Sequence, residues 1–300
     1  MNLSLGTAQF GSVYGITNKG VAPSVDNVHQ ILDMFIDSGN AFLDTAQEYG
    51  DAHEKISTWC KTRDFTSNFD LNITTKIHIK SKSDIDLFEE NVLKILAHMG
   101  LKKLYGILIH NPADLVDKKD CERLAVQFKN LKQSGLVKKT GISVYDPNEL
   151  LNLYDKIPEI DIVQCPVNIL DQRFLQPNIQ KFCMQNNIEL HARSLFLQGL
   201  LLADAIPANI VNHDVISVFK NYQQFIKAHG LKALQSCCLF FYQNRFKMDR
   251  WVVGFNCPKE TAEFLDQINK IEVHAEICFD EFKTNEHYID PRTWGYVTSC

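Results

Sequence analysis

The sequence predicts a single (β/α)8 TIM barrel, because a short apolar strand followed by an amphipathic helix recurs along the 300-residue chain. Eight strand candidates have aliphatic or β-branched sequences that do not alternate with polar residues, which is typical of strands buried on both faces. They are Leu3–Thr7, Ala41–Thr45, Leu71–Ile77, Leu104–His110, Lys139–Val144, Ile160–Cys165, Ile188–Arg193 and Trp251–Gly254. One barrel of about 250 residues explains the chain length as well as two domains would.

Helices are predicted between these strands from apolar residues at helical spacing, as in Val25–Ser38, where one stripe contains Val25, Val28, Ile31, Leu32 and Phe35. Prolines stand at three expected helix starts, and Gly39, Gly100, Gly135 and Gly230 at expected helix ends. The predicted helices are Val25–Ser38, Ala52–Cys60, Asp84–His98, Cys121–Gln133, Pro147–Tyr154, Pro177–Asn186, His213–His229 with Leu231–Gln243, and Pro258–Ile268.

A doubly wound open sheet is the alternative fold. Its usual phosphate-binding glycine triad is absent after the first strand, where the sequence is GTAQFG and no helix is expected immediately. Because no linker or low-complexity segment divides the chain, we expect one domain: a barrel over residues 1–270 and a tail over 271–300. The tail is too aromatic for a disordered end, so we expect it to pack on the barrel or on a second subunit; its aromatic residues are Phe279, Phe282, Tyr288, Trp294 and Tyr296.

Composition excludes several classes of protein. With 36 acidic and 31 basic residues the formal net charge is −5, which makes nucleic acid an unsuitable main partner. The apolar runs are too short to span a bilayer, and the N-terminus lacks the features of a signal peptide, so a soluble cytoplasmic protein is expected. The nine cysteines show no metal-binding spacing and are expected to be reduced thiols, with Cys300 exposed and oxidisable. No metal site is predicted.

Four polar residues at consecutive strand ends form a candidate catalytic group. In a TIM barrel, reactive side chains lie at the carboxyl ends of the strands, where Asp44, Tyr49, Lys76 and His110 can converge. Taken singly, each has an ordinary structural explanation, such as a helix cap or a solvated charge. Together they suit proton transfer to a carbonyl oxygen: Tyr49 as the donor, Lys76 tuning it, Asp44 holding Lys76 and His110 orienting the carbonyl. Side chains cannot supply hydride, so such a reduction implies a nicotinamide cofactor.

The order and spacing of several motifs resemble the aldo-keto reductase family over Leu3 to about Ile268. The matching residues are Gly6-Thr7, the DTAQEYG segment from Asp44 to Gly50, Thr75-Lys76, His110, Gly141-Ile142-Ser143 and Val163-Gln164. The resemblance implies a catalytic tetrad of Asp44, Tyr49, Lys76 and His110. Residues Ile188–Leu202 also resemble a bacterial branch associated with surface-polysaccharide gene clusters.

The same resemblance implies an NADP(H) or NAD(H) site. By position, Thr7 lies near the barrel floor, Ser143 and Gln164 near the nicotinamide carboxamide, and Ser194 near the pyrophosphate. The loop expected to cover the pyrophosphate contains Leu195, Gln198 and Gly199. The segment expected at the adenosine ribose runs from Gly254 to Glu263 and includes Phe255, Asn256 and Glu260.

Departures from the family pattern leave the form of the cofactor open. Val144 stands where an asparagine is common, and Arg193 replaces an aromatic residue that often stacks on the nicotinamide. Phe255 and Glu260 replace a serine and an arginine around the 2′-phosphate. Glu260 would repel that phosphate and suit a 2′-hydroxyl, whereas Lys259 could reach a phosphate in a shifted alignment.

The predicted function is reduction of an aldehyde or ketone, or the reverse reaction, with a sugar derivative as a candidate substrate through the branch resemblance. The polar residues Asn111, Asn168, Gln172 and Arg193 are expected to face the pocket. Phe10, Tyr14 and Trp294 either flank it or pack in loops.

Other histidines are expected to have surface or structural roles, with His191 a further candidate for the pocket; they are His53, His78, His98, His191, His213 and His229. A monomer or a small homo-oligomer fits the sequence equally well. A non-catalytic barrel that binds a nucleotide or a protein is the main alternative, and a lyase or epimerase with a retained cofactor is a third.

Overall fold

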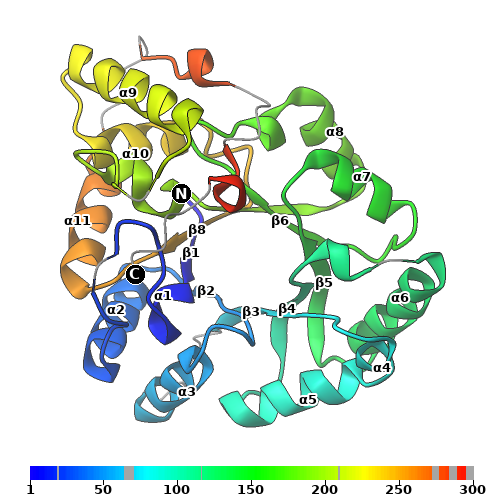
Figure 1. Ribbon diagram of the computed structural model, residues 1–300. Helices are drawn as coiled ribbons and strands as arrows, with labels where there is room; N and C mark the ends of the chain where they lie inside the picture. The colour runs from blue at the N-terminus through cyan, green and yellow to red at the C-terminus, as the bar shows by residue number, and fades with distance from the viewer. Residues whose placement is uncertain are drawn as a thin grey trace.

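The computed structural model describes residues 1–18, 20–63, 71–115, 117–208, 210–271, 277–283 and 289–294. Eight parallel strands form a closed barrel in chain order, with β8 paired to β1. Figure 1 shows the helices arranged around the outside of this barrel. The strands are β1 (Leu3–Gly6), β2 (Phe42–Asp44), β3 (Asn72–Ile77), β4 (Leu104–Ile109), β5 (Val137–Ser143), β6 (Ile162–Pro166), β7 (Glu189–Arg193) and β8 (Arg250–Gly254).

The predicted (β/α)8 barrel is confirmed, and the open-sheet alternative is excluded because β1 pairs with both β2 and β8. All eight predicted strands are present, and the largest shifts are two residues, at the starts of β5 and β6. In parallel pairing, neighbouring strands end at the same rim. Asp44 is thus aligned with Thr74 of β3, and Gln164 of β6 with Ser143 of β5.

The helices also follow the predicted pattern, with two differences. The single-turn helix α1 directly follows β1, where no helix was expected, and the predicted helix Asp84–His98 is divided at Leu87 into α4 and α5. The helices are α1 (Ala8–Gly11), α2 (Val25–Asp37), α3 (Ala52–Thr62), α4 (Lys82–Asp86), α5 (Phe88–Met99), α6 (Lys118–Gln133), α7 (Pro147–Tyr154), α8 (Pro177–Gln185), α9 (His213–Ala228), α10 (Ala233–Gln243) and α11 (Pro258–Asn269).

Helix ends and helix faces agree with the local sequence. Gly39, Gly100, Gly135 and Gly230 all have a positive φ, as the C-terminal positions of helices require. Four members of the predicted stripe of α2 are inaccessible to solvent, namely Val28, Ile31, Leu32 and Phe35. Burying each such side chain contributes about 1.5–3 kcal/mol, and this apolar contact holds the helices on the barrel. Val25, at the first position of the helix, was wrongly predicted to share the buried face and is 44% exposed.

Parts of the C-terminal segment pack on the helices. Phe279 lies 5.6 Å from Phe225 of α9 and 5.7 Å from Phe240 of α10, measured between ring centroids, and Phe282 also contacts Phe225. Trp294 is buried as well. Tyr288, Tyr296 and Cys300, which were named in the sequence predictions, lie outside the described residues. Within the described part of the chain, no helix combines the length and apolar character needed to cross a membrane.

Candidate active site

Three consecutive strands bring the predicted tetrad together. Asp44 ends β2, Lys76 lies on β3, and His110 follows β4 directly. The Lys76 ammonium donates hydrogen bonds to Asp44 Oδ1 at 2.6 Å and to the Tyr49 oxygen at 3.4 Å. The rings of Tyr49 and His110 lie edge to face with centroids 5.8 Å apart. The structure therefore places all four side chains at one point of the rim, as the spacing of the motif predicts.

The turn that presents Tyr49 depends on two glycines in close contact. Gly50 has a φ of +50°, and a Cβ on it would lie 2.2 Å from the Gly11 carbonyl oxygen. A Cβ on Gly11 would in turn overlap the carbonyl oxygen of Tyr49. Both positions thus exclude a side chain, which accounts for the glycine that ends the DTAQEYG motif. The turn after β2 packs directly on helix α1, and this contact fixes the backbone of Tyr49.

Lys76 is a buried cation with a complete set of partners. Its ammonium also donates to the Thr45 carbonyl oxygen at 2.9 Å. Burial by itself would lower the pKa of Lys76, but attraction to Asp44 and to the Tyr49 oxygen outweighs it and raises this pKa above its usual value. Lys76 therefore stays protonated and can stabilise negative charge that develops on the oxygen of Tyr49.

Gln164 joins the tetrad from β6, a contact that the sequence prediction missed. Its side-chain amide donates to Asp44 Oδ2 at 2.7 Å, and both side chains are buried. Each oxygen of Asp44 thus has one buried donor, Lys76 on Oδ1 and Gln164 on Oδ2. Because the two residues are 120 positions apart, no local sequence signal reveals this hydrogen bond.

His110 is held in its neutral form near neutral pH. Burial lowers its pKa to about 3, and the positive charges of Lys76 and Arg193 and the neighbouring His78 act in the same direction. A neutral imidazole carries one N–H and can donate a hydrogen bond to a carbonyl oxygen. Its Nδ1 atom is buried and has no hydrogen-bond partner among the residues that the structure describes.

A cavity of about 450 Å³ opens beside the tetrad and extends to the start of α11. Asp44 and Tyr49 line it, whereas Lys76 and His110 are not part of the described lining. Of the predicted cofactor residues, Ser143 is also buried outside the lining. The other predicted cofactor residues line the cavity: Thr7, Gln164, Arg193, Ser194, Leu195, Gln198, Gly199, Gly254, Phe255, Asn256 and Glu260.

The loop after β7 has an unusual backbone where it lines the cavity. Ser194, Leu197 and Gln198 have φ values of 56°, 49° and 55°, in the left-handed region that non-glycine residues rarely occupy. Such conformations cost of order 1–3 kcal/mol each and are concentrated at functional sites. Successive residues of this kind can turn backbone N–H groups toward an anion. The loop geometry therefore suits a phosphate-bearing ligand.

The loop after β1 covers part of this cavity, whereas only single residues of it, such as Tyr14, were placed near the pocket from the sequence. The Ile16 N–H donates to the Gln198 carbonyl oxygen at 3.1 Å, and a Cβ on Gly199 would lie 2.1 Å from Thr17 Oγ1. Asn18 also donates to the side-chain oxygen of Asn256 at 2.9 Å. These contacts connect the loops after β1, β7 and β8 across the cavity.

The far end of the cavity is acidic. Glu260, in the first turn of α11, accepts a hydrogen bond from the Asn256 N–H at 2.7 Å, and Glu263 also lines the wall. The Lys259 side chain is 83% exposed and lies 3.8 Å from Glu263. Among the described lining residues, Arg193 is the one cation, and it comes from β7 rather than from this end.

Arg193 is held by three contacts. Its guanidinium lies 4.1 Å from the ring centroid of Tyr145 and donates to the Val144 carbonyl oxygen at 3.0 Å and to Ser194 Oγ at 3.2 Å. Arg292 lies 3.4 Å from the same Tyr145 ring. Tyr145 thus contacts two guanidinium groups, and its stacking on Arg193 fixes the plane of that side chain beside the cavity.

Two residues that were expected to face the pocket do not do so. Asn168 is fully buried, donates to the Ser194 carbonyl oxygen and accepts from the N–H groups of Leu170 and Asp171. Gln172 is buried and donates to the Ile169 and Phe279 carbonyl oxygens. The expectation was wrong for both, because these side-chain amides form hydrogen bonds with backbone groups of their own loop, of the loop after β7 and of the C-terminal segment.

The remaining pocket candidates differ in whether they line the cavity or lie elsewhere. Tyr14 lines the cavity, whereas Phe10 and Trp294 are buried in the core. Asn111, which was also expected to face the pocket, is not among the described lining residues of the cavity, and its side chain accepts from the Ala113 N–H at 3.2 Å. His191 is buried and contacts Glu189 at 3.2 Å, which fits its structural interpretation.

Comparison with known proteins shows the family of the chain and agrees with its fold. The protein is a closed parallel (β/α)8 barrel with a Lys, Asp, Tyr and His group at its carboxyl rim and a cavity beside that group. The model of the aldo/keto reductase family matches residues 2–274, and the chain belongs to this family. Among solved structures, PA4992 of Pseudomonas aeruginosa, a proposed aldo-keto reductase, is 14% identical with a TM-score of 0.61, over 89% of both chains. At this identity the likeness shows the fold. A search of the curated proteins found no match.

Proposed function

We propose that this protein reduces the carbonyl group of an aldehyde or ketone, with Tyr49 as the proton donor. One observation carries the proposal: the Tyr49 oxygen lies 3.4 Å from the buried Lys76 ammonium, which Asp44 holds at 2.6 Å, and Tyr49 lines the cavity. Family membership supports a carbonyl oxidoreductase in general. The geometry of these three side chains supports the specific assignment of the acid.

Each member of the tetrad has a role that follows from its contacts. Tyr49 gives its proton to the carbonyl oxygen as that oxygen becomes an alkoxide. Lys76 stabilises the charge left on the Tyr49 oxygen, and Asp44 keeps the ammonium in place. Neutral His110 donates a hydrogen bond that orients the carbonyl group. Gln164 holds the second oxygen of Asp44 and thereby fixes the carboxylate.

The cavity fits a nicotinamide dinucleotide, which supplies the hydride when bound. Its volume of about 450 Å³ falls in the range of ligand sites, and it extends from Tyr49 to the first turn of α11. The left-handed loop of Ser194, Leu197 and Gln198 suits the phosphates. Thr7, Gln164 and Arg193 would hold the end nearest Tyr49, and Asn256 and Glu260 the opposite end.

The acidic end of the cavity favours a cofactor with a free 2′-hydroxyl. Glu260 and Glu263 line that end, and Lys259 points to solvent with 83% of its side chain exposed. A carboxylate repels a 2′-phosphate and can accept a hydrogen bond from a 2′-hydroxyl. We therefore propose NAD(H) in preference to NADP(H). From the sequence alone, the choice between these two forms of the cofactor was left open.

The substrate is proposed to be polar. Glu48, His78 and His110 lie together at the rim, so the carbonyl would enter beside charged and hydrogen-bonding groups. Such surroundings suit a hydroxylated substrate, and a sugar derivative agrees with the resemblance to the polysaccharide-associated branch. That branch assignment stays a prediction.

The variant Tyr49→Phe tests the proposal because it removes the proton donor and keeps the ring. Turnover of a panel of aldehydes, ketones and sugars should fall at least about a hundredfold, in the range that general acid catalysis contributes. The Kd for the reduced cofactor should change less than about threefold, or about 0.7 kcal/mol. Tyr154→Phe is the control, since Tyr154 packs on Phe182 outside the barrel. Turnover within tenfold of the wild type would refute the acid role, and cofactor binding by a wild type that turns over none of the panel would favour the non-catalytic barrel.

A further inference from the structure

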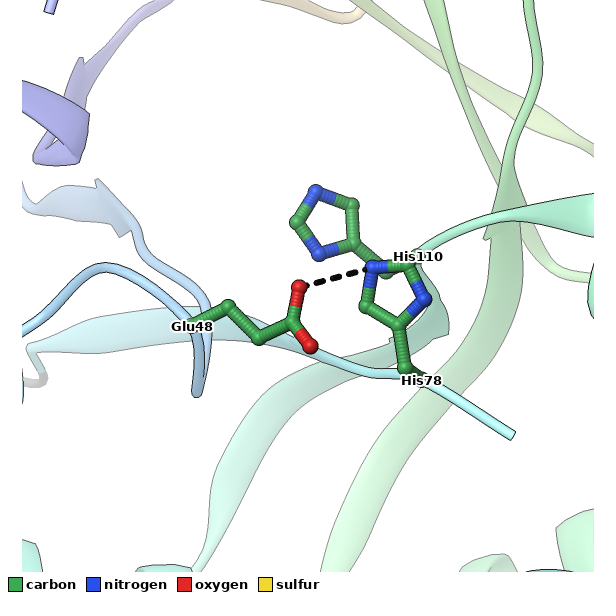
Figure 2. A group of neighbouring side chains, drawn as sticks. All are labelled: Glu48, His78 and His110. Carbon is green, nitrogen blue, oxygen red and sulfur yellow. Dashed lines mark ion pairs between the residues drawn. The ribbon is translucent and has the colours of Figure 1, made fainter. Parts of the chain in front are cut away.

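Glu48, His78 and His110 form a compact cluster at the rim that the proposed reaction does not use as a unit. One donor atom of each residue lies within 4.8 Å of the other two. His78 Nε2 is 2.9 Å from Glu48 Oε2, and the rings of His78 and His110 have centroids 4.6 Å apart. Figure 2 shows the His110 ring beside the Glu48–His78 pair, with one ring nitrogen toward it.

The fold fixes this cluster from three adjacent segments. Glu48 belongs to the turn after β2, immediately before Tyr49, while His78 and His110 directly follow β3 and β4. β3 and β4 pair in parallel with Ile77 opposite Ile109, so the residues that follow them, His78 and His110, are neighbours at the rim. The relative positions of the two imidazoles are therefore set by strand register rather than by a flexible loop.

The donor set is that of a transition-metal site. Two imidazoles and one carboxylate are ligands that Zn²⁺ and similar borderline divalent ions prefer, and catalytic zinc sites often have three protein ligands and one open position. Zinc bonds of about 2.0–2.1 Å in a tetrahedron place donor atoms about 3.3 Å apart. Closing the present cluster to that spacing requires movements of about 1.5 Å, within reach of the torsions of a side chain such as Glu48, which is 40% exposed.

A second observation also points to a missing partner. His110 Nδ1 is buried and has no hydrogen-bond partner in the described part of the chain, although a buried polar atom without one is costly. Two of the neighbouring positive charges do not block an ion. Lys76 is already neutralised by Asp44, and Lys80, 3.0 Å from Glu48, has a 75% exposed side chain that can turn into solvent.

We propose that Glu48, His78 and His110 bind a divalent transition-metal ion of the zinc class. Bound in this way, the ion draws the His110 ring toward Glu48 and His78 and away from the position in which its N–H orients the carbonyl group, so the ion inhibits reduction. The binding site stands on the cluster alone, whereas the inhibition rests on the proposed function. Occupancy of the site would then link carbonyl reduction to the concentration of available zinc.

Calorimetric titration of the full-length, chelator-treated protein with Zn²⁺ tests the site. One Zn²⁺ should bind per chain, with affinity at least tenfold weaker in His78→Gln and in Glu48→Gln. The control His213→Gln removes an exposed histidine at the start of α9 and should bind as the wild type does. Equal affinity in the wild type and in both cluster variants would overturn the proposal.

Two further readouts separate the remaining outcomes. Co²⁺ in place of Zn²⁺ should give a d–d spectrum without a sulfur-to-metal charge-transfer band, and such a band would assign the binding to cysteines instead. Zn²⁺ should lower the turnover of the wild type, and His78→Gln should need at least tenfold more Zn²⁺ for the same inhibition. If Zn²⁺ binds at the cluster while turnover is unchanged, the inhibition is refuted and the site stands. The Tyr49→Phe experiment tests the reductase assignment without any metal.

Discussion

The ammonium of Lys76 and the carboxylate of Asp44 form an ion pair of 2.6 Å whose side chains are only 1% and 5% exposed. Two opposite charges are thus removed from water together, and each has further partners in Thr45 and Gln164. A buried pair of this kind need not add stability overall, but it keeps both groups in one geometry. In this barrel that geometry places a positive charge beside the oxygen of Tyr49.

Removing one member of the pair should affect stability and turnover together. Asp44→Asn leaves the Lys76 ammonium buried without an opposite charge, so the free energy of unfolding should fall by about 3–5 kcal/mol. Turnover should fall at least about a hundredfold, because the ammonium is no longer held beside Tyr49. Denaturant titration measures the first effect and a steady-state assay the second.

A surface pair provides the control for this experiment. Glu90 and Lys94 lie 2.7 Å apart on α5 with both side chains more than half exposed. Glu90→Gln should change the free energy of unfolding by no more than about 0.5 kcal/mol. If Asp44→Asn lowers the free energy of unfolding no more than Glu90→Gln does, the prediction that the buried pair of Asp44 and Lys76 is needed for stability is wrong.

Mild acid should destabilise the fold through buried His53 and partly buried His110. Burial, with His98 and Lys76, lowers the pKa of His53 to about 4, and burial, with Lys76, His78 and Arg193, lowers that of His110 to about 3. The unfolded chain protonates both histidines below about pH 6.5, whereas the folded protein keeps them neutral, so their contribution to stability is present above pH 6.5 and is lost as the pH falls. The free energy of unfolding should therefore decrease from about pH 6.5 toward pH 4.

His53 gives a direct check of that pH dependence. His53→Gln keeps a partner for Thr75, which lies 3.1 Å from His53 Nε2, and removes the titrating group. Denaturant titrations at several pH values should show a smaller slope of the free energy of unfolding against pH for this variant than for the wild type. His229→Gln, at an exposed helix end, should retain the wild-type slope. Identical slopes for His53→Gln and the wild type would contradict the assignment.

The form of the cofactor depends on Glu260 in the present proposal. The wild type should bind NADH more tightly than NADPH in parallel fluorescence titrations. Glu260→Gln keeps an acceptor for the Asn256 N–H but removes the charge, so the ratio of Kd for NADPH to Kd for NADH should fall about fivefold, or about 1 kcal/mol.

Lys259 offers the matched control for the cofactor experiment. Its side chain is exposed and is not among the described lining residues, so Lys259→Gln should leave both dissociation constants within about twofold. A loss of NADPH affinity in this variant, with tight NADPH binding in the wild type, would assign the 2′-phosphate to Lys259 and refute the NAD(H) proposal.

Local sequence patterns determined the strands, the helices and the helix ends. Buried strands and amphipathic helices follow from the periodicity of apolar residues, and the glycine helix ends from backbone sterics, so each depends on a few neighbouring residues. The tetrad could also be placed in advance, because Asp44, Lys76 and His110 stand at the ends of successive strands that must meet at one rim.

Tertiary structure decided where the other polar side chains point. Gln164 bonds to Asp44, Arg193 stacks on Tyr145, and Asn168 turns away from the cavity to bond with backbone groups. His78, interpreted from the sequence as a surface or structural residue, lies beside His110 at the rim. The rotamer of each side chain depends on the partners that the fold brings near it, and those partners lie on other segments of the chain. The sequence by itself therefore determined the barrel and the position of the tetrad at its rim, and packing decided the hydrogen bonds and charges that surround the tetrad.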